Sequence, residues 1–214
     1  MEERKKDKIY MVGAGDHAKV VLSTLEACNV ECVGIYDDNP ALWGKTLWCI
    51  PILGAISTMP DTSETMAVIA MADLDTRQKI FEQFKNVCWP VFVHPFSIVH
   101  SSVHLCEGTI VLPGSIIESD AHLGKHCIIQ SGCFIGHDTR LGNFCHMTPK
   151  SVVANNVKLG KKVFLGIGAV VRPYVTVVDN VTIGMGSAVV SDIDKSGMYL
   201  GVPAQMVVPQ PPKD

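Results

Sequence analysis

A histidine followed directly by an aspartate, His137 and Asp138 in the segment IGHDTR, is the residue pair best suited to proton transfer in this chain. A neutral imidazole accepts a proton from an amine or hydroxyl nucleophile near neutral pH, and an adjacent carboxylate holds its tautomer and raises its basicity. A histidine on a solvated turn would leave the same sequence. The spacing alone leaves both interpretations open.

A second candidate is the glycine turn GAGDHA, in which Gly13, Gly15 and Ala18 match the pattern G-x-G-x-x-G/A. In such turns, backbone N–H groups and a helix N-terminus approach phosphate oxygens. Asp37 and Asp38 end the next apolar segment, where a ribose hydroxyl would be bound. Only about ninety residues form this part of the chain, which is short of the two halves of a full NAD site. We therefore favour a nucleotide-sugar over NAD, and a purely structural turn stays as the alternative.

The segments around this turn alternate between strand and helix patterns. Strands are predicted at KIYMVG, CVGIYD, MAVIAM and VCWPVFV, with helices from the turn to Cys28 and over 73–86, and a loop between the second and third strands. This order predicts a small parallel α/β sheet. His17 either contacts a phosphate or satisfies the start of the first helix.

The rest of the chain follows a six-residue repeat. Every sixth residue from Val99 is Leu, Ile, Val or Met: Val99, Leu105, Val111, Ile117, Leu123, Ile129, Ile135, Leu141, Met147, Val153, Leu159, Leu165, Val171, Val177, Ile183 and Val189. A second column, four residues later, is mostly small or β-branched. A period of six fits a short strand plus a turn, so three units predict one 18-residue triangular coil, and successive coils stack as parallel strands.

Composition excludes several classes of protein. The net charge of -3 and pI of 6.2 supply no basic field for nucleic acid. The eight cysteines form no CxxC motif and the start MEERKKDK lacks a secretory pattern, so we expect a reduced cytosolic protein. No apolar run approaches the roughly 20 residues of a membrane span.

Other reactive side chains favour structural interpretations. His104, His122, Arg140 and Lys158 are 18 apart, which predicts a solvated basic edge at one corner of the prism rather than a metal site, because that column holds no carboxylate or cysteine. The thiols in the small-residue column are expected to be packed; they are Cys127, Cys133 and Cys145. Trp43 and Trp48 either cover apolar surface or stack on a base.

The chain resembles bacterial sugar O/N-acetyltransferases of the sialic acid O-acetyltransferase type, within the hexapeptide-repeat superfamily. The resemblance spans about residues 8 to 206 and is carried, in order, by GAGDHA, GIYDDNPALWGK, IPILG, HPFS, IGHDTRLGNFCHM, LGKKVFLGIGAVVRP and GMYLGVPAQ. It implies a left-handed parallel β-helix after the Rossmann-like domain, a homotrimer, and acetyl-CoA as co-substrate without a metal.

The resemblance also implies roles for individual residues. His137 would be the catalytic base and Asp138 its helper. The coenzyme would contact His146 at the thioester and, along its arm, Asn155, Ile167 and Met185. The nucleotide-sugar would contact Gly15, Asp16, His17, Asp37, Asp38 and Ala72. Ala72 stands where many relatives carry glycine, and the carboxylate of Asp16 would repel a pyrophosphate unless it points away.

Together these patterns and the resemblance predict a nucleotide-sugar-binding domain over 1–93, an acetyltransferase domain over 94–206 and a Pro-rich tail over 207–214. We expect a cytoplasmic enzyme of glycan biosynthesis that acetylates the 4-amino group of a nucleotide-linked 4-amino-4,6-dideoxy sugar by direct transfer. Acetylation of a sugar hydroxyl, as on sialic acid, and a non-catalytic trimeric scaffold that binds nucleotide-sugar are the alternatives.

Overall fold

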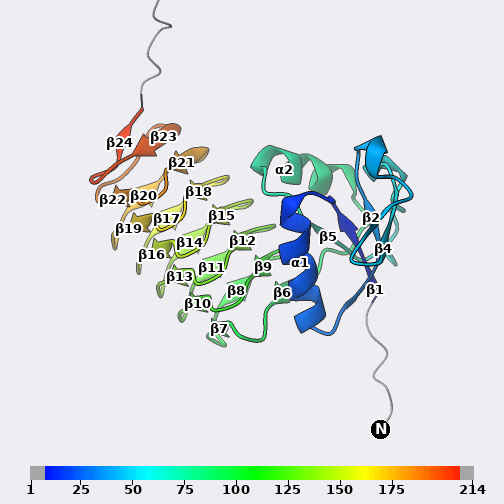
Figure 1. Ribbon diagram of the computed structural model, residues 1–214. Helices are drawn as coiled ribbons and strands as arrows, with labels where there is room; N and C mark the ends of the chain where they lie inside the picture. The colour runs from blue at the N-terminus through cyan, green and yellow to red at the C-terminus, as the bar shows by residue number, and fades with distance from the viewer. Residues whose placement is uncertain (1–7, 208–214) are drawn as a thin grey trace, which may run out of the picture. The chain divides into compact units, whose positions relative to one another are not determined.

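The computed structural model describes residues 8–207, which form two compact units. The first unit runs to Pro95 and includes Glu107–Ile110, and the second comprises Phe96–Cys106 and the chain from Val111 onward (Figure 1). Of the tail predicted over 207–214, all but Val207 lies outside the described residues. Over the described part of the chain, no helix is long and apolar enough to cross a membrane.

The first unit is an α/β domain built on a five-stranded sheet in the order β3-β4-β2-β1-β5. Its strands are β1 (Lys8–Val12), β2 (Glu31–Tyr36), β3 (Thr46–Leu47), β4 (Ile50–Gly54) and β5 (Ala67–Ile69), and β6 (Phe92–Val93) lies near its end. Its helices are α1 (Asp16–Ala27) and α2 (Leu74–Gln83), with short 3₁₀ turns η1 (Pro40–Leu42) and η2 (Ile56–Thr58). β1 pairs in parallel with both β2 and β5, which confirms the predicted parallel sheet.

Two predictions for this unit were wrong. The segment IPILG, expected in a loop, forms β4 and pairs in parallel with β2 through Ile35 and Ile52. Only Ile52 is buried in that strand, so its alternation of apolar and polar residues is too weak to predict a strand. The predicted strand VCWPVFV is reduced to a single bridge at Cys88 and the short β6, because Pro90 has no N–H to donate to a ladder.

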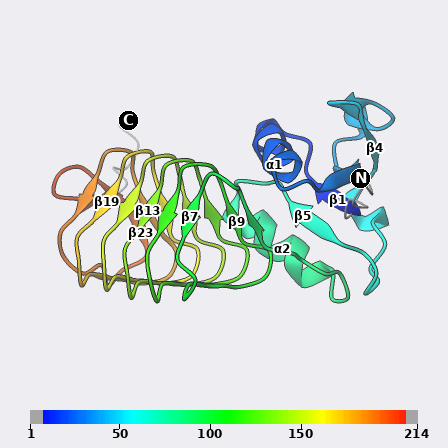
Figure 2. The same ribbon diagram turned by 90° about the horizontal axis from the view of Figure 1, so that it is seen from below.

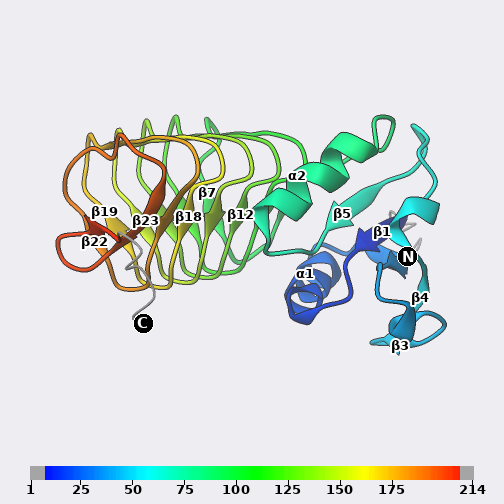
Figure 3. The same cartoon turned by 90° about the horizontal axis from the view of Figure 1, so that it is seen from above.

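The second unit is a solenoid of stacked coils, seen from below and above in Figures 2 and 3. Its first face carries β7 (Ile98–Val99), β10 (Ile116–Ile117), β13 (Phe134–Ile135), β16 (Val152–Val153), β19 (Val170–Val171) and β22 (Ala188–Val189). The second face carries β8 (His104–Leu105), β11 (His122–Leu123), β14 (Arg140–Leu141), β17 (Lys158–Leu159) and β20 (Thr176–Val177). On the third face lie β9 (Ile110–Val111), β12 (Ile128–Ile129), β15 (His146–Met147), β18 (Phe164–Leu165), β21 (Val181–Ile183), β23 (Gly197–Leu200) and β24 (Gln205–Met206).

The strand register confirms the 18-residue coil. Paired residues lie 18 apart on each face, as Ile117 with Ile135, Leu123 with Leu141, and Met147 with Leu165. From Val111 to Ile183, the residues of the predicted apolar column are buried along the coil axis. The six-residue period therefore sets both the direction of each side chain and the stacking of each strand.

A left-handed backbone conformation recurs at every sixth residue and produces the turns. Positive φ angles occur at Gly108, Gly114, Asp120, His126, Gly132, Asp138, Phe144, Lys150, Asn156, Lys162, Gly168, Tyr174, Asn180 and Gly186. Many of these are not glycine, so coil stacking holds the conformation against its intrinsic cost. Three turns per coil follow from this repeat.

The glycines that follow the apolar column have a different cause. A Cβ at Gly142 would lie 2.6 Å from the Gly160 carbonyl carbon in the next coil, and a Cβ at Gly124 would lie 2.7 Å from the Asn143 backbone nitrogen. Neither glycine has a positive φ. Close approach of successive coils, rather than unusual dihedral angles, accounts for this glycine column.

The three faces present different outward side chains. The first face is apolar throughout, with Ile98, Ile116, Phe134, Val152, Val170 and Ala188 in register. On the second face, His104, His122, Arg140 and Lys158 form the predicted ladder. These four residues lie in strands β8, β11, β14 and β17, so the prediction that they stand at a corner was wrong. Each six-residue unit places its short strand, and not its turn, at this position.

Candidate active site

His137 and Asp138 lie at the turn between β13 and β14. The Asp138 Oδ2 atom is 2.8 Å from His137 Nδ1, and the two side chains are 54% and 46% exposed respectively. Asp138 holds the left-handed position of the turn at φ 59°, which brings its carboxylate beside the preceding imidazole. A proton on Nδ1 that donates to the carboxylate leaves Nε2 as the proton acceptor.

The coil above His137 presents a backbone amide to the same turn. The His137 N–H donates to the Glu118 carboxylate at 3.1 Å, and the residue in register with Glu118 one coil later is Gly136. A Cβ on Gly136 would lie 2.5 Å from the Asn155 nitrogen. Gly136 has no side chain that could accept a hydrogen bond from the Asn155 N–H, as Glu118 does from the His137 N–H. Within residues 8–207, the Asn155 N–H therefore makes no such bond.

An apolar cavity of about 430 Å³ collects a second group of predicted residues. Ile167 and Met185 line it, both strongly exposed, together with Phe164 and the small residues of the neighbouring strands. Gln130 also lines it, and its amide Nε2 lies 2.6 Å from the Nε2 atom of buried His146. Among residues 8–207, no charged side chain lines this cavity, so it suits an uncharged, flexible arm of a ligand.

The predicted residues therefore fall at two different corners of the coil. The His137 corner, with Asp138 and Asn155, joins the first face to the second. The Ile167 corner, with Met185 one coil later, joins the third face to the first. Within one chain the apolar first face separates them, so a single copy does not bring all the predicted residues together.

The glycine turn of the first unit lies at the carboxyl end of β1. Gly13 has φ 104°, and a Cβ there would meet the Met71 side chain at 3.0 Å and the Ala70 carbonyl oxygen at 3.2 Å. Gly15 caps α1 with an ordinary φ of -77°. Within residues 8–207, a Cβ added to it would meet nothing within 4 Å beyond its chain neighbours. Open space at a helix N-terminus suits an anionic ligand, although Asp16 starts the helix and is exposed there.

Asp37 and Asp38 are used by the fold itself. Asp37 accepts hydrogen bonds from the backbone N–H groups of Ala14 at 2.7 Å and Asn39 at 2.8 Å. Asp38 accepts from the Ile56 N–H at 2.9 Å. The first aspartate thus ties the glycine turn to the end of β2, which also supports a ligand site made from that turn.

A buried arginine that the sequence reading overlooked stands behind the turn. Arg77 Nη1 donates to the carbonyl oxygens of Met71 at 3.2 Å and Ala72 at 3.0 Å, so it fixes the loop that holds Ala72. Burial, and then the positive charge of Arg77, lower the pKa of His17. His17 is therefore neutral at neutral pH, and it can offer a hydrogen bond to a ligand without adding charge.

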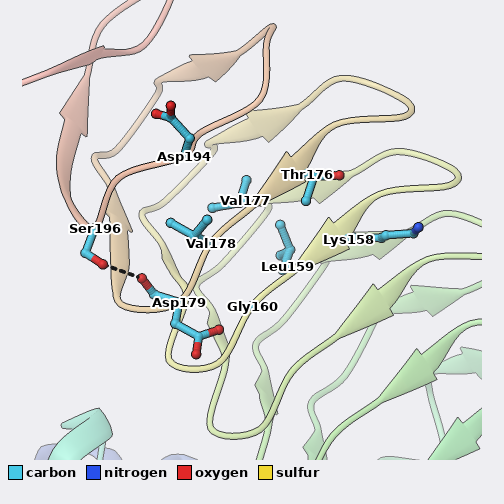
Figure 4. A pocket seen from close by; sticks show the side chains of 9 residues that line it. All are labelled: Lys158, Leu159, Gly160, Thr176, Val177, Val178, Asp179, Asp194 and Ser196. Atoms are coloured by element: carbon cyan, nitrogen blue, oxygen red, sulfur yellow. Dashed lines mark hydrogen bonds between the residues drawn. The ribbon is translucent and has the colours of Figure 1, made fainter.

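A second hollow, of about 530 Å³, lies on the later coils (Figure 4). Lys158, Asp179 and Asp194 supply its charges, and the Ser196 hydroxyl donates to the Asp179 carbonyl oxygen at 2.9 Å. Two carboxylates against one ammonium disfavour a phosphate ligand here. We assign it no role.

Comparison with known proteins identifies the two halves separately and then together. Residues 8–84 match the PglD N-terminal domain, and residues 102–137 match the bacterial transferase hexapeptide (six repeats). A mutant of perosamine N-acetyltransferase from Caulobacter crescentus, solved with CoA and GDP-perosamine, is 33% identical, with 94% of this chain and 97% of that chain covered at a TM-score of 0.90. The chain belongs to the hexapeptide-repeat acetyltransferases with a PglD-type N-terminal domain. The solenoid is accordingly a left-handed β-helix, as predicted.

Further members of this acetyltransferase family align over nearly the full chain. PerB from Caulobacter crescentus, with CoA and GDP-perosamine, is 34% identical at a TM-score of 0.88, covering 94% of this chain and 97% of that one. The acetyltransferase domain of PglB from Neisseria gonorrhoeae is 25% identical at 0.87, covering 94% and 100%. The chain spans about a fifth of the curated relative it matches, an uncharacterized protein of Acanthamoeba polyphaga mimivirus, 30% identical over 100 residues.

At the candidate active site and the glycine turn, sequence reasoning missed three residues: Glu118, Gln130 and Arg77. Glu118 and Gln130 precede their partners by 19 and 16 residues, close to one coil, so the repeat itself could have found them. No local pattern marks Arg77, whose contacts arise from the fold of the α/β unit.

Proposed function

We propose that this acetyltransferase moves the acetyl group of acetyl-CoA to the 4-amino group of a nucleotide-linked 4-amino-4,6-dideoxy sugar. The observation that carries the proposal is the His137–Asp138 pair, with the Asn155 amide directly above it at one turn of the wall. Relatives solved with CoA and a GDP-linked amino sugar support this substrate class.

His137 acts as general base in this proposal. As the amine nitrogen attacks the thioester carbonyl carbon, Nε2 takes the amine proton, while Asp138 holds the proton on Nδ1. The Asn155 N–H donates to the oxyanion that develops on the carbonyl oxygen. The tetrahedral intermediate expels the CoA thiolate, which receives the proton from the imidazolium, so no acyl-enzyme forms.

The first unit holds the nucleotide part of the acceptor. We assign this to the α1 N-terminus at Gly15 and to neutral His17, with Asp16 turned toward solvent. Asp37, Asp38 and Ala72 shape the turn and its neighbouring loop, and in this proposal they also contact the bound nucleotide-sugar. The apolar cavity at Ile167 and Met185 holds the pantetheine arm of acetyl-CoA, with His146 near its reactive end.

A homotrimer completes the site. The apolar first face offers a continuous column of six side chains that a neighbouring copy can cover, and it lies between the His137 corner and the Ile167 corner. In a trimer whose threefold axis runs parallel to the axes of the three β-helices, the His137 corner of one copy lies toward the Ile167 corner of the next. Because acetyl-CoA and nucleotide-sugars are metabolites of the cytoplasm, we also propose that the enzyme works there.

Thiol release from acetyl-CoA, measured with a panel of acceptors, tests the function. The panel contains nucleotide-linked 4-amino sugars with guanine, uracil or thymine bases, their 4-hydroxy counterparts, and free sialic acid. We expect thiol release and a gain of one acetyl group only with amino acceptors. Acetylation of hydroxyl acceptors alone would contradict the N-transfer assignment, and tight acceptor binding without thiol release from any acceptor would favour a scaffold.

Light scattering tests the assembly. The active species should have three times the 23.2 kDa mass of the chain. Ile116→Arg places a charge in the first-face column and should give monomers with little activity, whereas Lys158→Ala on the second face should remain trimeric. An active monomer would contradict the shared site.

A further inference from the structure

Two histidines and a cysteine of the first two coils gather on the second face of the β-helix. His104 and His122 are paired across β8 and β11, and their rings stack with centroids 4.5 Å apart and an interplanar angle of 18°. Cys106 Sγ lies 4.0 Å from His122 Nε2. One ligand atom from each of the three residues falls within 4.8 Å of the others.

This spacing is close to that of a metal-binding set. With Zn–N distances of about 2.0–2.1 Å and a Zn–S distance of about 2.3 Å, tetrahedral ligands lie about 3.5 Å apart. His104 is exposed and the other two are half-buried, which leaves their side chains room to rotate toward one shared ion. Nitrogen and thiolate ligands together select zinc over calcium or magnesium, which prefer oxygen.

The cysteine was invisible in the sequence ladder because it lies outside that column. Cys106 is in register with Gly124, Gly142 and Gly160, whose lack of a side chain lets successive coils approach. In the first coil this position carries a thiol beside the two imidazoles instead. The ladder that was expected to be purely basic therefore begins, in the first two coils, with a cluster of two imidazoles and one thiol.

The charges around the cluster are compatible with a dication. Arg140, next in the column, would repel a cation. A Cys106 thiolate bound to the metal offsets part of that repulsion.

We propose that His104, Cys106 and His122 bind one Zn²⁺ ion that clips the first two coils together, with water as the fourth ligand. The site is independent of the acetyl transfer assigned to His137. Because the ion binds the folded arrangement, it should raise the thermal stability of the β-helix.

Equilibrium dialysis of the tag-free protein against buffered Zn²⁺, and absorption spectra with Co²⁺, test this site. We expect one tightly bound ion per chain and a thiolate-to-cobalt charge-transfer band. Cys106→Ser should abolish that band. Since loss of outer partners already costs about 10–100-fold in metal affinity, His104→Gln or His122→Gln should cost at least about 100-fold.

Matched controls are His100→Gln and Cys88→Ser, which remove an exposed histidine and an exposed cysteine elsewhere. Far-UV circular dichroism establishes that each variant is folded. Zinc should raise the melting temperature of the protein and both controls, but not of the three cluster variants. Binding that is absent in the parent protein, or that survives in the three cluster variants at parent affinity, would overturn the proposal.

Discussion

The β-helix and the α/β unit both place glycines and acidic residues at turns, but the two folds use them differently. In the β-helix, the left-handed position accepts Asp, Asn, Lys, His, Phe, Tyr or Gly alike, so the register fixes the backbone and leaves the side chain free. In the α/β unit, Gly13 needs its own φ, and Asp37 and Asp38 hold backbone amides. A reactive pair in the repeat is therefore more informative about function than a motif residue in the α/β unit.

The largest expected effect tests the repeat side of this comparison. His137→Ala should lower the turnover rate by about 10²–10⁴-fold, the usual contribution of a general base, while acetyl-CoA affinity changes little because the apolar cavity is untouched. Steady-state kinetics together with CoA titration would measure both. Retention of more than about a tenth of the activity would place the base elsewhere, with His146 the next candidate.

Asp138→Asn serves as the matched variant for that measurement. It keeps the left-handed turn, which asparagine tolerates, but removes the charge 2.8 Å from Nδ1. The rate should therefore fall by less than in His137→Ala. An equal or larger loss would mean that the carboxylate itself handles the proton.

A second test compares two glycines of the repeat: one where the next coil comes too close for a side chain, and one that needs a positive φ. Gly142→Ala puts a methyl group 2.6 Å from backbone of the next coil and should destabilise the β-helix by the upper part of the about 1–3 kcal/mol typical of overpacking. In Gly168→Ala, the added methyl meets no atom of the described residues within 4 Å beyond its chain neighbours, so the substitution costs only its positive φ, about 1 kcal/mol. Thermal melts followed by circular dichroism compare the two. The reverse order would disprove the distinction.

These differences also explain what the sequence could predict. The hexad column gave the coil length, the stacking of His104 on His122 and the place of His137, because all depend on register alone. The pairing of β4 with β2 and the hydrogen bond from Arg77 to the Ala72 carbonyl oxygen depend on the tertiary fold of the α/β unit. No local sequence period indicates them. The contact between Cys106 and His122 was missed for a related reason. It joins residues of two neighbouring columns, whereas the repeat relates residues within the same column.

The glycine turn allows a third test, in which stability and binding respond to different residues. Gly13→Ala should destabilise the α/β unit by about 1–2 kcal/mol, because its φ of 104° is strained for alanine and Met71 is close. Gly15→Ala should cost less stability, up to about 1 kcal/mol for alanine at an N-cap position. It should raise the KM for the acceptor, since the added methyl enters the open space at the α1 N-terminus. The three tryptophans, Trp43, Trp48 and Trp89, all lie in this unit, so fluorescence melts report on it alone. An unchanged KM in Gly15→Ala would remove the nucleotide-sugar from this turn.

The smallest expected effect concerns the pH dependence of the same unit. Burial and Arg77 lower the pKa of His17 in the folded protein, so the unfolded chain binds its proton more readily. The stability that His17 contributes is thus fully present above its unfolded pKa of about 6.5 and is lost as the pH falls through the lower folded value.

Tryptophan fluorescence melts should show the melting temperature falling less steeply between pH 7 and 5 in His17→Gln than in the parent. Burial, followed by the charges of His104 and Arg140, also lowers the pKa of His122, but His122 lies in the β-helix and is the same in both proteins, so the difference isolates His17. Parallel acid slopes for His17→Gln and the parent would show that His17 is free to take up a proton in the folded unit, and would remove the neutral hydrogen-bonding role assigned to it in the nucleotide-sugar site.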